Sequence, residues 1–366
     1  MDGISLMIKP ASGACENDCA YCFYQNEMRC REVGNRGIMT LQTLESLVKK
    51  AFAASRMVSF IFQGGEPMLA GRDFYEAFVR MARTYGAGKP YTCSIQTAGG
   101  RIDADWADFL KKEGFLVGLS VDGDEASHDL YRKDKSGLGT YAAAMRAAEL
   151  LRQKEVPFNV LCVVTKANAA CPEATYDALR QFGYIQFIPC LEAFKSAERI
   201  FSPDPETYAR FLIAAFDRYE ADFRQGRYVS VRTFDNYLRL LSGARPEACS
   251  MCGRCTVGLT VESDGSVYPC DFYCLDEYRL GSIEEMSLNE LMKCEKAAAF
   301  VNESVYMHPE CRRCRFYSLC RGGCRREREP FDEMGRPGLN RYCASYRSFF
   351  EARYANLQSL SQLISN

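Results

Sequence analysis

The chain has 366 residues, 47% of them hydrophobic and 25% charged, with a formal net charge of −1 and a pI of about 6.3. This length can bury a barrel-sized core together with a smaller domain. The balanced charge gives no bulk attraction to nucleic acid or to an anionic membrane, so neither is expected as a partner. No apolar run approaches the roughly 20 residues that span a bilayer, and the first residues lack the pattern of a signal peptide.

Cysteine is frequent, with 19 residues, whereas histidine occurs only as His128 and His308. Without an export signal we expect a cytoplasmic protein, and a reducing compartment disfavours a disulfide framework. Many cysteines in such a protein indicate metal binding. The scarcity of histidine disfavours a histidine-rich zinc site and a histidine-based catalytic triad. Carboxylates, tyrosine or lysine are therefore the expected acid–base groups.

In the first half of the chain, short apolar runs alternate with amphipathic segments. This alternation predicts βαβ units and a parallel sheet. The predicted strands are Ile4–Ile8, Val58–Phe62, Tyr91–Gln96, Phe115–Val121, Phe158–Val164 and Ile185–Pro189, and the predicted helices are Leu41–Ala54, Asp73–Thr84, Asp103–Glu113, Thr140–Lys154 and Pro172–Phe182. Six such units indicate an α/β fold built as an open six-stranded barrel, with its chemistry at the C-terminal ends of the strands. The pattern becomes helical from about Pro203 to Leu241 and is rich in loops and cysteine after Cys249.

Cys15, Cys19 and Cys22 follow the first predicted strand at C-x₃-C-x₂-C spacing. A structural zinc site or an electron-carrying 4Fe–4S cluster takes four protein ligands, whereas three thiolates leave one iron open for a small molecule with an amine and a carboxylate. A zinc knuckle or three buried thiols are the alternatives. With Phe23 after the third cysteine, the motif resembles the signature of the radical S-adenosylmethionine enzymes. That resemblance implies a partial (β/α)6 barrel, a 4Fe–4S cluster on these cysteines and S-adenosylmethionine (AdoMet) as cofactor.

The second predicted strand is followed by Gln63-Gly64-Gly65-Glu66-Pro67. Paired glycines let the backbone approach a ligand closely, and a fixed carboxylate can take an ammonium group. In the family that the chain resembles, this motif holds the methionine amino group of AdoMet, which implies cofactor contacts for Gln63, Gly64, Gly65 and Glu66. The alternative is a Gly-Gly turn with a surface glutamate.

Further cofactor contacts are expected near the ends of later strands. Ser120 and Asp122 offer a hydroxyl and a carboxylate for a ribose, and Arg132 can neutralise the cofactor carboxylate. A helix cap and a solvated arginine are the alternatives for these residues. The resemblance also implies that Tyr21 and Leu191 belong to the cofactor site.

Eight cysteines in the last third of the chain fit two four-thiolate sites. They are Cys249, Cys255, Cys270, Cys311, Cys314, Cys320, Cys324 and Cys343. We expect little other core there, so metal has to hold the shape. Two zinc sites are one possibility. The pattern resembles the SPASM extension of peptide-modifying radical enzymes, with two auxiliary 4Fe–4S clusters and hence three clusters in all.

The SPASM resemblance also implies a ligand set for each auxiliary cluster. Cys249, Cys255, Cys270 and Cys324 form the first set, and Cys311, Cys314, Cys320 and Cys343 form the second. Cys252 and Cys274 lie near proposed ligands and leave this pairing open. The implied domains are a barrel over 1–230 and a SPASM domain with a C-terminal helix over 231–366.

Asp271 directly follows the proposed cluster ligand Cys270. A carboxylate at this position could take a proton from a substrate while an electron passes from the substrate to the cluster. From the residues alone, a turn-forming aspartate is the alternative. The chain as a whole is similar to the anaerobic sulfatase-maturating enzymes, in the segments Ile8–Ser12, Cys22–Tyr24, Phe62–Pro67, Leu161–Thr165, Glu262–Tyr273 and Cys320–Cys324. That family's proposed proton acceptor corresponds to Asp271.

This resemblance implies a reaction and its partners. A 5′-deoxyadenosyl radical takes a β-hydrogen from a Cys or Ser in the Cys/Ser-x-Pro-x-Arg segment of an unfolded sulfatase, and the product is Cα-formylglycine. An electron donor such as flavodoxin or ferredoxin is implied as well. Radical chemistry suits the strong C–H bond.

Two departures from the family pattern keep alternatives open. Ala98 stands where the family has Asn, and Cys274 stands where an apolar residue is expected. One alternative is a related SPASM enzyme that modifies a ribosomally made peptide, for example by a thioether crosslink. A non-catalytic iron–sulfur or zinc scaffold is another.

Overall fold

The computed structural model describes residues 2–194, 196 and 198–365. It divides into two compact units. The first contains Met1–Ser120, Arg132–Phe158 and Val257–Phe300, and the second contains Val121–Tyr131, Asn159–Thr256 and Val301–Asn366.

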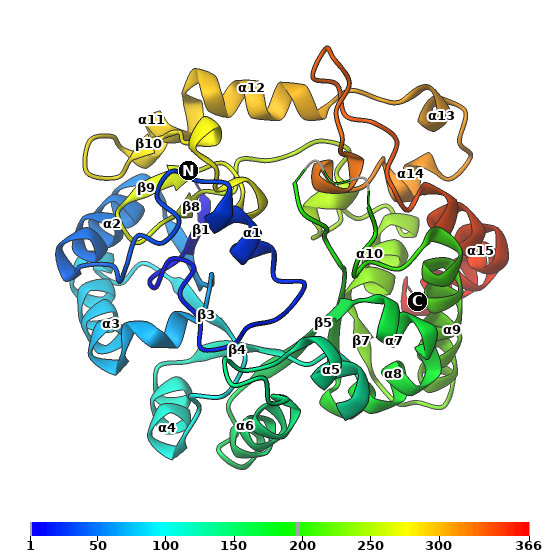
Figure 1. The fold of residues 1–366 in the computed structure, drawn as a ribbon, viewed down its shortest axis with the longest axis horizontal. Coiled ribbons are helices and arrows are strands. Elements are labelled where there is room, and N and C mark those ends of the chain that lie inside the picture. The colour runs from blue at the N-terminus through cyan, green and yellow to red at the C-terminus, as the bar shows by residue number, and fades with distance from the viewer. Residues whose placement is uncertain (1, 195, 197, 366) are drawn as a thin grey trace. The chain divides into compact units, whose positions relative to one another are not determined.

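The first unit is built on a parallel sheet whose strands follow chain order (Figure 1). The strands are β1 (Gly3–Ile8), β2 (Met57–Phe62), β3 (Tyr91–Thr97) and β4 (Phe115–Ser120). The connecting helices are α1 (Phe23–Arg29), α2 (Leu41–Ala54), η1 (Pro67–Ala70), α3 (Arg72–Gly86), α4 (Ala104–Lys112) and α6 (Tyr141–Gln153). Alternate strand residues are buried because one face of the sheet packs against the helices, as Phe60 and Phe62 of β2 do against Phe78 of α3, with ring centroids 5.0 and 4.9 Å apart.

A later segment of the chain extends this sheet beyond β1. Its elements are β8 (Thr260–Val261), β9 (Ser266–Tyr268), η4 (Asp271–Tyr273), η5 (Asp276–Tyr278), β10 (Gly281–Ser282), α11 (Leu288–Lys293) and α12 (Glu295–Ser304), the last reaching past the unit boundary. β8 runs parallel to β1, and Asp264-Gly265 forms the turn between the antiparallel strands β8 and β9. Leu259, Val267 and Ile283 join the apolar core of the first unit. The expectation of little core in this region is therefore wrong for 257–300, because the segment completes a sheet that begins at the N-terminus.

The second unit contains a second parallel ladder and a helical layer. Its elements are α5 (Glu125–Tyr131), β5 (Phe158–Val164), α7 (Lys166–Ala170), α8 (Pro172–Leu179), η2 (Arg180–Phe182), β6 (Tyr184–Pro189), α9 (Pro205–Arg224), β7 (Ser230–Val231), α10 (Arg232–Leu241), η3 (Cys249–Met251), α13 (Pro309–Arg312), α14 (Tyr317–Cys320), η6 (Arg325–Arg328) and α15 (Cys343–Ser365). β5, β6 and β7 are parallel neighbours. α9 and α15 lie side by side (Figure 1). Aromatic residues join these helices, and the rings of Phe216 and Phe349 are 5.7 Å apart.

All six predicted strands and all five predicted helices are present, and all but the last helix end within two residues of their predicted ends. The segment Pro172–Phe182 is divided into α8 and η2. Among the described residues, no helix is both long and apolar enough to cross a membrane. The predicted domain boundary at residue 230 stays a prediction.

Candidate active site

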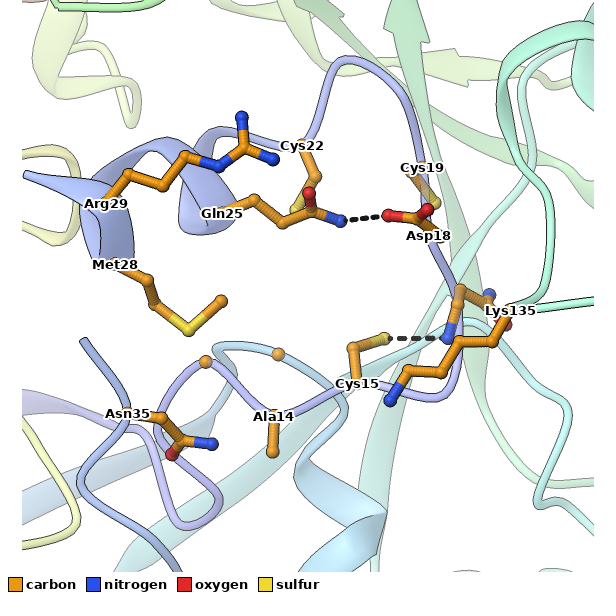
Figure 2. Close-up of a pocket in the computed structure, with 13 residues that line it drawn as sticks. Ala14, Cys15, Asp18, Cys19, Cys22, Gln25, Met28, Arg29, Asn35 and Lys135 are labelled. Atoms are coloured by element: carbon orange, nitrogen blue, oxygen red, sulfur yellow. Dashed lines mark hydrogen bonds between the residues drawn. The ribbon is translucent and has the colours of Figure 1, made fainter.

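The loop that follows β1 brings its three cysteines to one cavity. Cys15, Cys19 and Cys22 line a space of about 430 Å³ in the first unit (Figure 2). The other lining residues are Gly13, Ala14, Asn17, Asp18, Gln25, Met28, Arg29, Asn35, Gly65 and Lys135. The cavity is wide enough to take a ligand beside the thiols, which suits a cluster with one open iron.

Backbone contacts fix the shape of this cysteine loop. The Asp18 N–H donates to the Lys133 carbonyl over 2.7 Å, and Asn17 pairs with Asp134. Within the loop, the Gln25 amide donates to Asp18 over 2.7 Å, as the dashed line in Figure 2 marks. The loop is therefore braced by residues far along the sequence.

The chemistry of the thiols fits a metal centre. Burial raises the pKa of Cys15 to about 12, and burial also raises the pKa of Cys22. Such thiols become thiolates by binding metal, which supplies the positive charge. No group of three or more His, Cys, Asp or Glu side chains in the described part of the chain is arranged around a single metal ion. A 4Fe–4S cluster is larger than one ion and holds its thiolates farther apart.

The glycine pair after β2 packs against the cysteine loop. Gly64 and Gly65 both have positive φ angles, of 90° and 51°. A Cβ on Gly65 would lie 2.1 Å from the Ala14 carbonyl oxygen, and one on Gly64 would lie 2.5 Å from Lys9 Cγ. The next residue, Glu66, donates its N–H to the Ala14 carbonyl over 2.7 Å. The motif needs glycine because its backbone touches the cysteine loop directly.

The Glu66 carboxylate is buried, with 1% of its surface exposed, and is engaged by the chain itself. It accepts hydrogen bonds from the N–H of Met68 over 3.1 Å and that of Ala98 over 3.0 Å, and from the Thr97 hydroxyl over 2.9 Å. Burial raises its pKa to about 7, against the opposing effect of these donors. The carboxylate thus ties the end of β3 to the glycine motif, and the Ala98 departure preserves this contact because the backbone makes it.

Asp271 lies at the centre of a second group of polar residues in the same unit. Its Oδ2 accepts a hydrogen bond from the Tyr24 hydroxyl over 2.7 Å, and the Gln63 amide donates to Tyr24 over 2.8 Å and to the same Oδ2 over 3.4 Å. Burial raises the pKa of Asp271, although Lys9 and the Tyr24 hydrogen bond lower it. A buried carboxylate with a raised pKa is a stronger base than one in water.

Charged residues continue this group into the interior. Lys9 Nζ lies 2.9 Å from Glu27 Oε2, 3.4 Å from Asp271 Oδ1 and 3.8 Å from Glu262 Oε1. The Arg31 guanidinium pairs with Glu262 over 2.5 Å. Sequence analysis did not identify Lys9, Glu27 or Tyr24 as site residues, although Lys9 and Tyr24 belong to segments that carried the family resemblance.

The remaining predicted cofactor contacts have separate surroundings. Ser120 accepts a hydrogen bond from the Gln96 amide over 2.9 Å, and the Arg132 guanidinium lies 5.5 Å from the centre of the Tyr21 ring. In the second unit, Asp122 is buried and accepts from the Val163 N–H over 2.8 Å. Leu191, also in this unit, is half-buried and follows β6.

The second auxiliary ligand set comes together in the second unit. Cys311, Cys314, Cys320 and Cys343 line one cavity, together with aromatic side chains that include Phe316 and Tyr346. Burial raises the pKa of Cys320 to about 12, so these thiols also suit a metal centre. Four thiols around one apolar space match the donor set of a closed 4Fe–4S cluster.

Three members of the first auxiliary set, Cys249, Cys255 and Cys324, belong to the second unit, whereas Cys270 belongs to the first. Burial raises the pKa of Cys255, and Cys249 adds to this effect. A hydrogen bond with Ser304 and the charges of Arg325 and Arg328 partly oppose it. This set stays a prediction. Arg325 and Arg328 are buried and act on the Cys255 thiol, so their positive charge would offset the negative charge of a cluster held there.

Comparisons with known proteins agree with this site. The family model for the Radical SAM superfamily matches residues 10–179, and that for an iron-sulfur cluster-binding domain, SPASM, matches 249–315. The chain is 43% identical over the full length of both proteins to the cysteine-type anaerobic sulfatase-maturating enzyme of Clostridium perfringens (strain 13 / Type A). It is 29% identical to the serine-type enzyme of Bacteroides thetaiotaomicron, over 94% of this chain and 88% of the relative.

A solved structure, native anSMEcpe with bound AdoMet and Cp18Cys peptide, covers 99% of both chains with a TM-score of 0.94 and 41% identity. This similarity confirms the predicted α/β fold with a radical AdoMet barrel and a SPASM domain, and the two domains indicate iron–sulfur clusters as cofactors. It disfavours a non-catalytic scaffold and a peptide-crosslinking enzyme. The chain belongs to the anaerobic sulfatase-maturating enzymes, a family of radical AdoMet enzymes with a SPASM domain.

Proposed function

We propose that this enzyme oxidises a cysteine in the Cys-x-Pro-x-Arg segment of an unfolded sulfatase to Cα-formylglycine. The observation that carries the choice of cysteine is the 43% identity with a cysteine-type relative along the whole chain, against 29% with a serine-type relative. The buried carboxylate of Asp271 supports the proposal, because oxidation of a thiol to a carbonyl needs a proton acceptor.

When bound, the cofactors supply a 5′-deoxyadenosyl radical at the three-cysteine site and an auxiliary acceptor for the second electron. The cysteine side chain loses one hydrogen atom from Cβ, the thiol proton and one electron, which leaves a thioaldehyde. Water then replaces sulfur, and the products are the aldehyde and hydrogen sulfide. Asp271 takes the thiol proton, and Tyr24 and Gln63 hold its Oδ2 during this step.

Cys15, Cys19 and Cys22 would hold the 4Fe–4S cluster whose open iron binds AdoMet. We assign AdoMet itself to Tyr21, Gln63, Gly64, Gly65, Glu66, Ser120, Asp122, Arg132 and Leu191. The contacts of Glu66 favour an indirect role, in which its carboxylate holds the strand ends that surround the cofactor. The contacts of Gln63 likewise favour a role beside Asp271.

We also propose an electron donor and a cellular location for this enzyme. A small acidic electron carrier such as flavodoxin or ferredoxin would reduce the cluster, and a cytoplasmic location would keep the 19 cysteines reduced. All the proposed cluster cysteines are half-buried except Cys249, which is exposed, so a reducing location would protect them from oxidation.

Two peptides that differ only in Cys or Ser at the first position of the x-Pro-x-Arg segment test the substrate. Equal amounts of both would be incubated without oxygen with reconstituted enzyme, AdoMet and reductant, and the aldehyde products would be counted by mass spectrometry. We expect the Cys peptide to be converted faster. Preferential conversion of the Ser peptide would contradict the cysteine-type assignment, and conversion of neither would contradict the proposed substrate.

A further inference from the structure

Lys9 is a buried cation directly after β1, and its position is fixed along its whole length. Its N–H donates to the Val261 carbonyl over 2.9 Å, and its side chain packs against Gly64, where no Cβ could fit. Only 1% of the side chain is exposed. A lysine seldom becomes this buried without several partners, because desolvation of the ammonium group is costly.

Three carboxylates surround the Lys9 ammonium, and the shortest contact, of 2.9 Å, is to Glu27. Glu27 is itself fixed, because its other oxygen accepts the Cys274 N–H over 3.1 Å. The contact with Glu262 is longer, at 3.8 Å, and Glu262 is paired with Arg31. Glu27 is therefore the nearest of the three carboxylates to the ammonium, and it holds Lys9 Nζ beside Asp271.

The two oxygens of Asp271 have different surroundings. Oδ2 receives the hydrogen bonds from Tyr24 and Gln63. Oδ1 is buried and accepts no hydrogen bond from the described residues, and Lys9 Nζ lies 3.4 Å from it. Hydrogen bonds to Oδ2 alone still let the carboxylate tilt about that oxygen through small changes in its side-chain torsions, and the attraction between Oδ1 and the ammonium opposes that tilt.

We propose that Lys9 is a positioning residue, which fixes the plane of the Asp271 carboxylate through Oδ1 while Tyr24 and Gln63 hold Oδ2. The inference rests on the proposed function, because it takes Asp271 to be the group that receives the substrate proton. Only 1% of the Lys9 side chain is exposed, so we assign it no contact with the substrate. Its role is to keep radical formation coupled to product formation, because a misplaced Asp271 carboxylate would not remove the thiol proton of the substrate cysteine.

A double substitution, Lys9→Met with Glu27→Gln, tests this role. It removes one buried charge of each sign, so the net charge of the group is unchanged, and the amide oxygen introduced at position 27 can still accept the Cys274 N–H. The matched control is Lys49→Met with Glu45→Gln, which makes the same replacements in an exposed pair separated by 2.8 Å.

For each protein we would measure iron content, 5′-deoxyadenosine, formylglycine and the KM of the Cys peptide. The double variant should keep its iron, its AdoMet cleavage and its peptide KM, while formylglycine per 5′-deoxyadenosine falls on the order of ten- to a hundredfold. The control should match the wild type in all four.

Two results would overturn the inference. One is an unchanged ratio of formylglycine to 5′-deoxyadenosine in the double variant. The other is a loss of iron or AdoMet cleavage in proportion to product, because Lys9 would then have a structural role. A wild-type enzyme that cleaves AdoMet but converts no Cys peptide would instead contradict the proposed function.

Discussion

The Tyr24 hydroxyl donates a hydrogen bond of 2.7 Å to Asp271, although 247 positions separate the two residues. Tyr24 belongs to α1, which begins directly after Cys22, and Asp271 begins η4 directly after Cys270. The contact therefore links the loop that carries the first three thiols to the loop that carries the proposed base. Both loops belong to the first unit because β8 adds to the sheet beside β1.

Replacement of Asp271 by Asn separates radical formation from product formation. The amide keeps the shape of the side chain but is a far weaker base, so we expect 5′-deoxyadenosine to form while formylglycine falls by about a hundredfold. Single-turnover assays that count both products check this. Full formylglycine production by Asp271→Asn would remove Asp271 as the base.

Replacement of Cys19 by Ala removes one of three ligands to the first cluster. Wild-type protein should contain about twelve iron atoms per chain, and the variant about eight with no AdoMet cleavage. Cys30→Ala is the control, since Cys30 is exposed and outside the proposed ligand sets. Normal cleavage by Cys19→Ala would contradict the assignment, and zinc in place of the auxiliary iron would favour zinc sites in the C-terminal region.

Replacement of Gly65 by Ala should displace the cysteine loop. The added Cβ would meet the Ala14 carbonyl oxygen at 2.1 Å, and a backbone atom cannot move aside as a flexible side chain can. Gly37→Ala is the matched control, because its φ of 76° is also positive but no atom lies within 4 Å of the added Cβ. We expect Gly65→Ala to lose first-cluster iron and AdoMet cleavage and Gly37→Ala to keep both. Equal iron content in the two variants would show that the close contact is unimportant.

The Glu66 carboxyl makes stability depend on pH. Its pKa in the folded protein is raised to about 7 by burial, above the unfolded value, so the folded state keeps a proton that the unfolded chain has lost. The stability from this group is complete below about pH 4.5 and falls by about 3 kcal/mol as pH rises through 7.

Glu66→Gln removes this titration, so its urea midpoint should fall less between pH 5 and about pH 7.5 than that of the wild type. Oxygen-free unfolding of both holoproteins at each pH measures the difference. Glu27 is unchanged in both proteins and cancels from the comparison. Parallel profiles would mean that Glu66 does not carry a raised pKa.

Much of the barrel could be predicted from the sequence because its strands and helices are long enough to show a period. Phe158–Val164 and Leu41–Ala54 match their predicted ends. β8 and β10 have two residues each, too few for any period, and they are recognisable only from the strands beside them. The role of 257–300 in the core of the first unit was therefore not predictable from local pattern.

In the candidate site, too, some residues could be predicted from the sequence and others could not. Cysteine spacing predicted the candidate thiols, and adjacency to Cys270 together with the family resemblance predicted Asp271. Lys9 and Glu27 were missed because an isolated Lys or Glu in a sequence is most often on the surface. They are buried here because they pair with each other and with distant residues, Lys9 with Asp271 and Glu27 with the Cys274 N–H. Cys274 stood out because it departs from the family pattern. It is fully buried and its N–H donates to Glu27, which favours a structural role.

The most direct test of the account is a Cys-x-Pro-x-Arg peptide with deuterium at both Cβ positions of the cysteine. It would be incubated without oxygen with the reconstituted holoenzyme, AdoMet and reductant, and both products would be weighed by mass spectrometry. The account predicts an aldehyde that retains one deuterium and 5′-deoxyadenosine that carries the other. Cleavage of AdoMet with no deuterium in 5′-deoxyadenosine and no change in the peptide would contradict it.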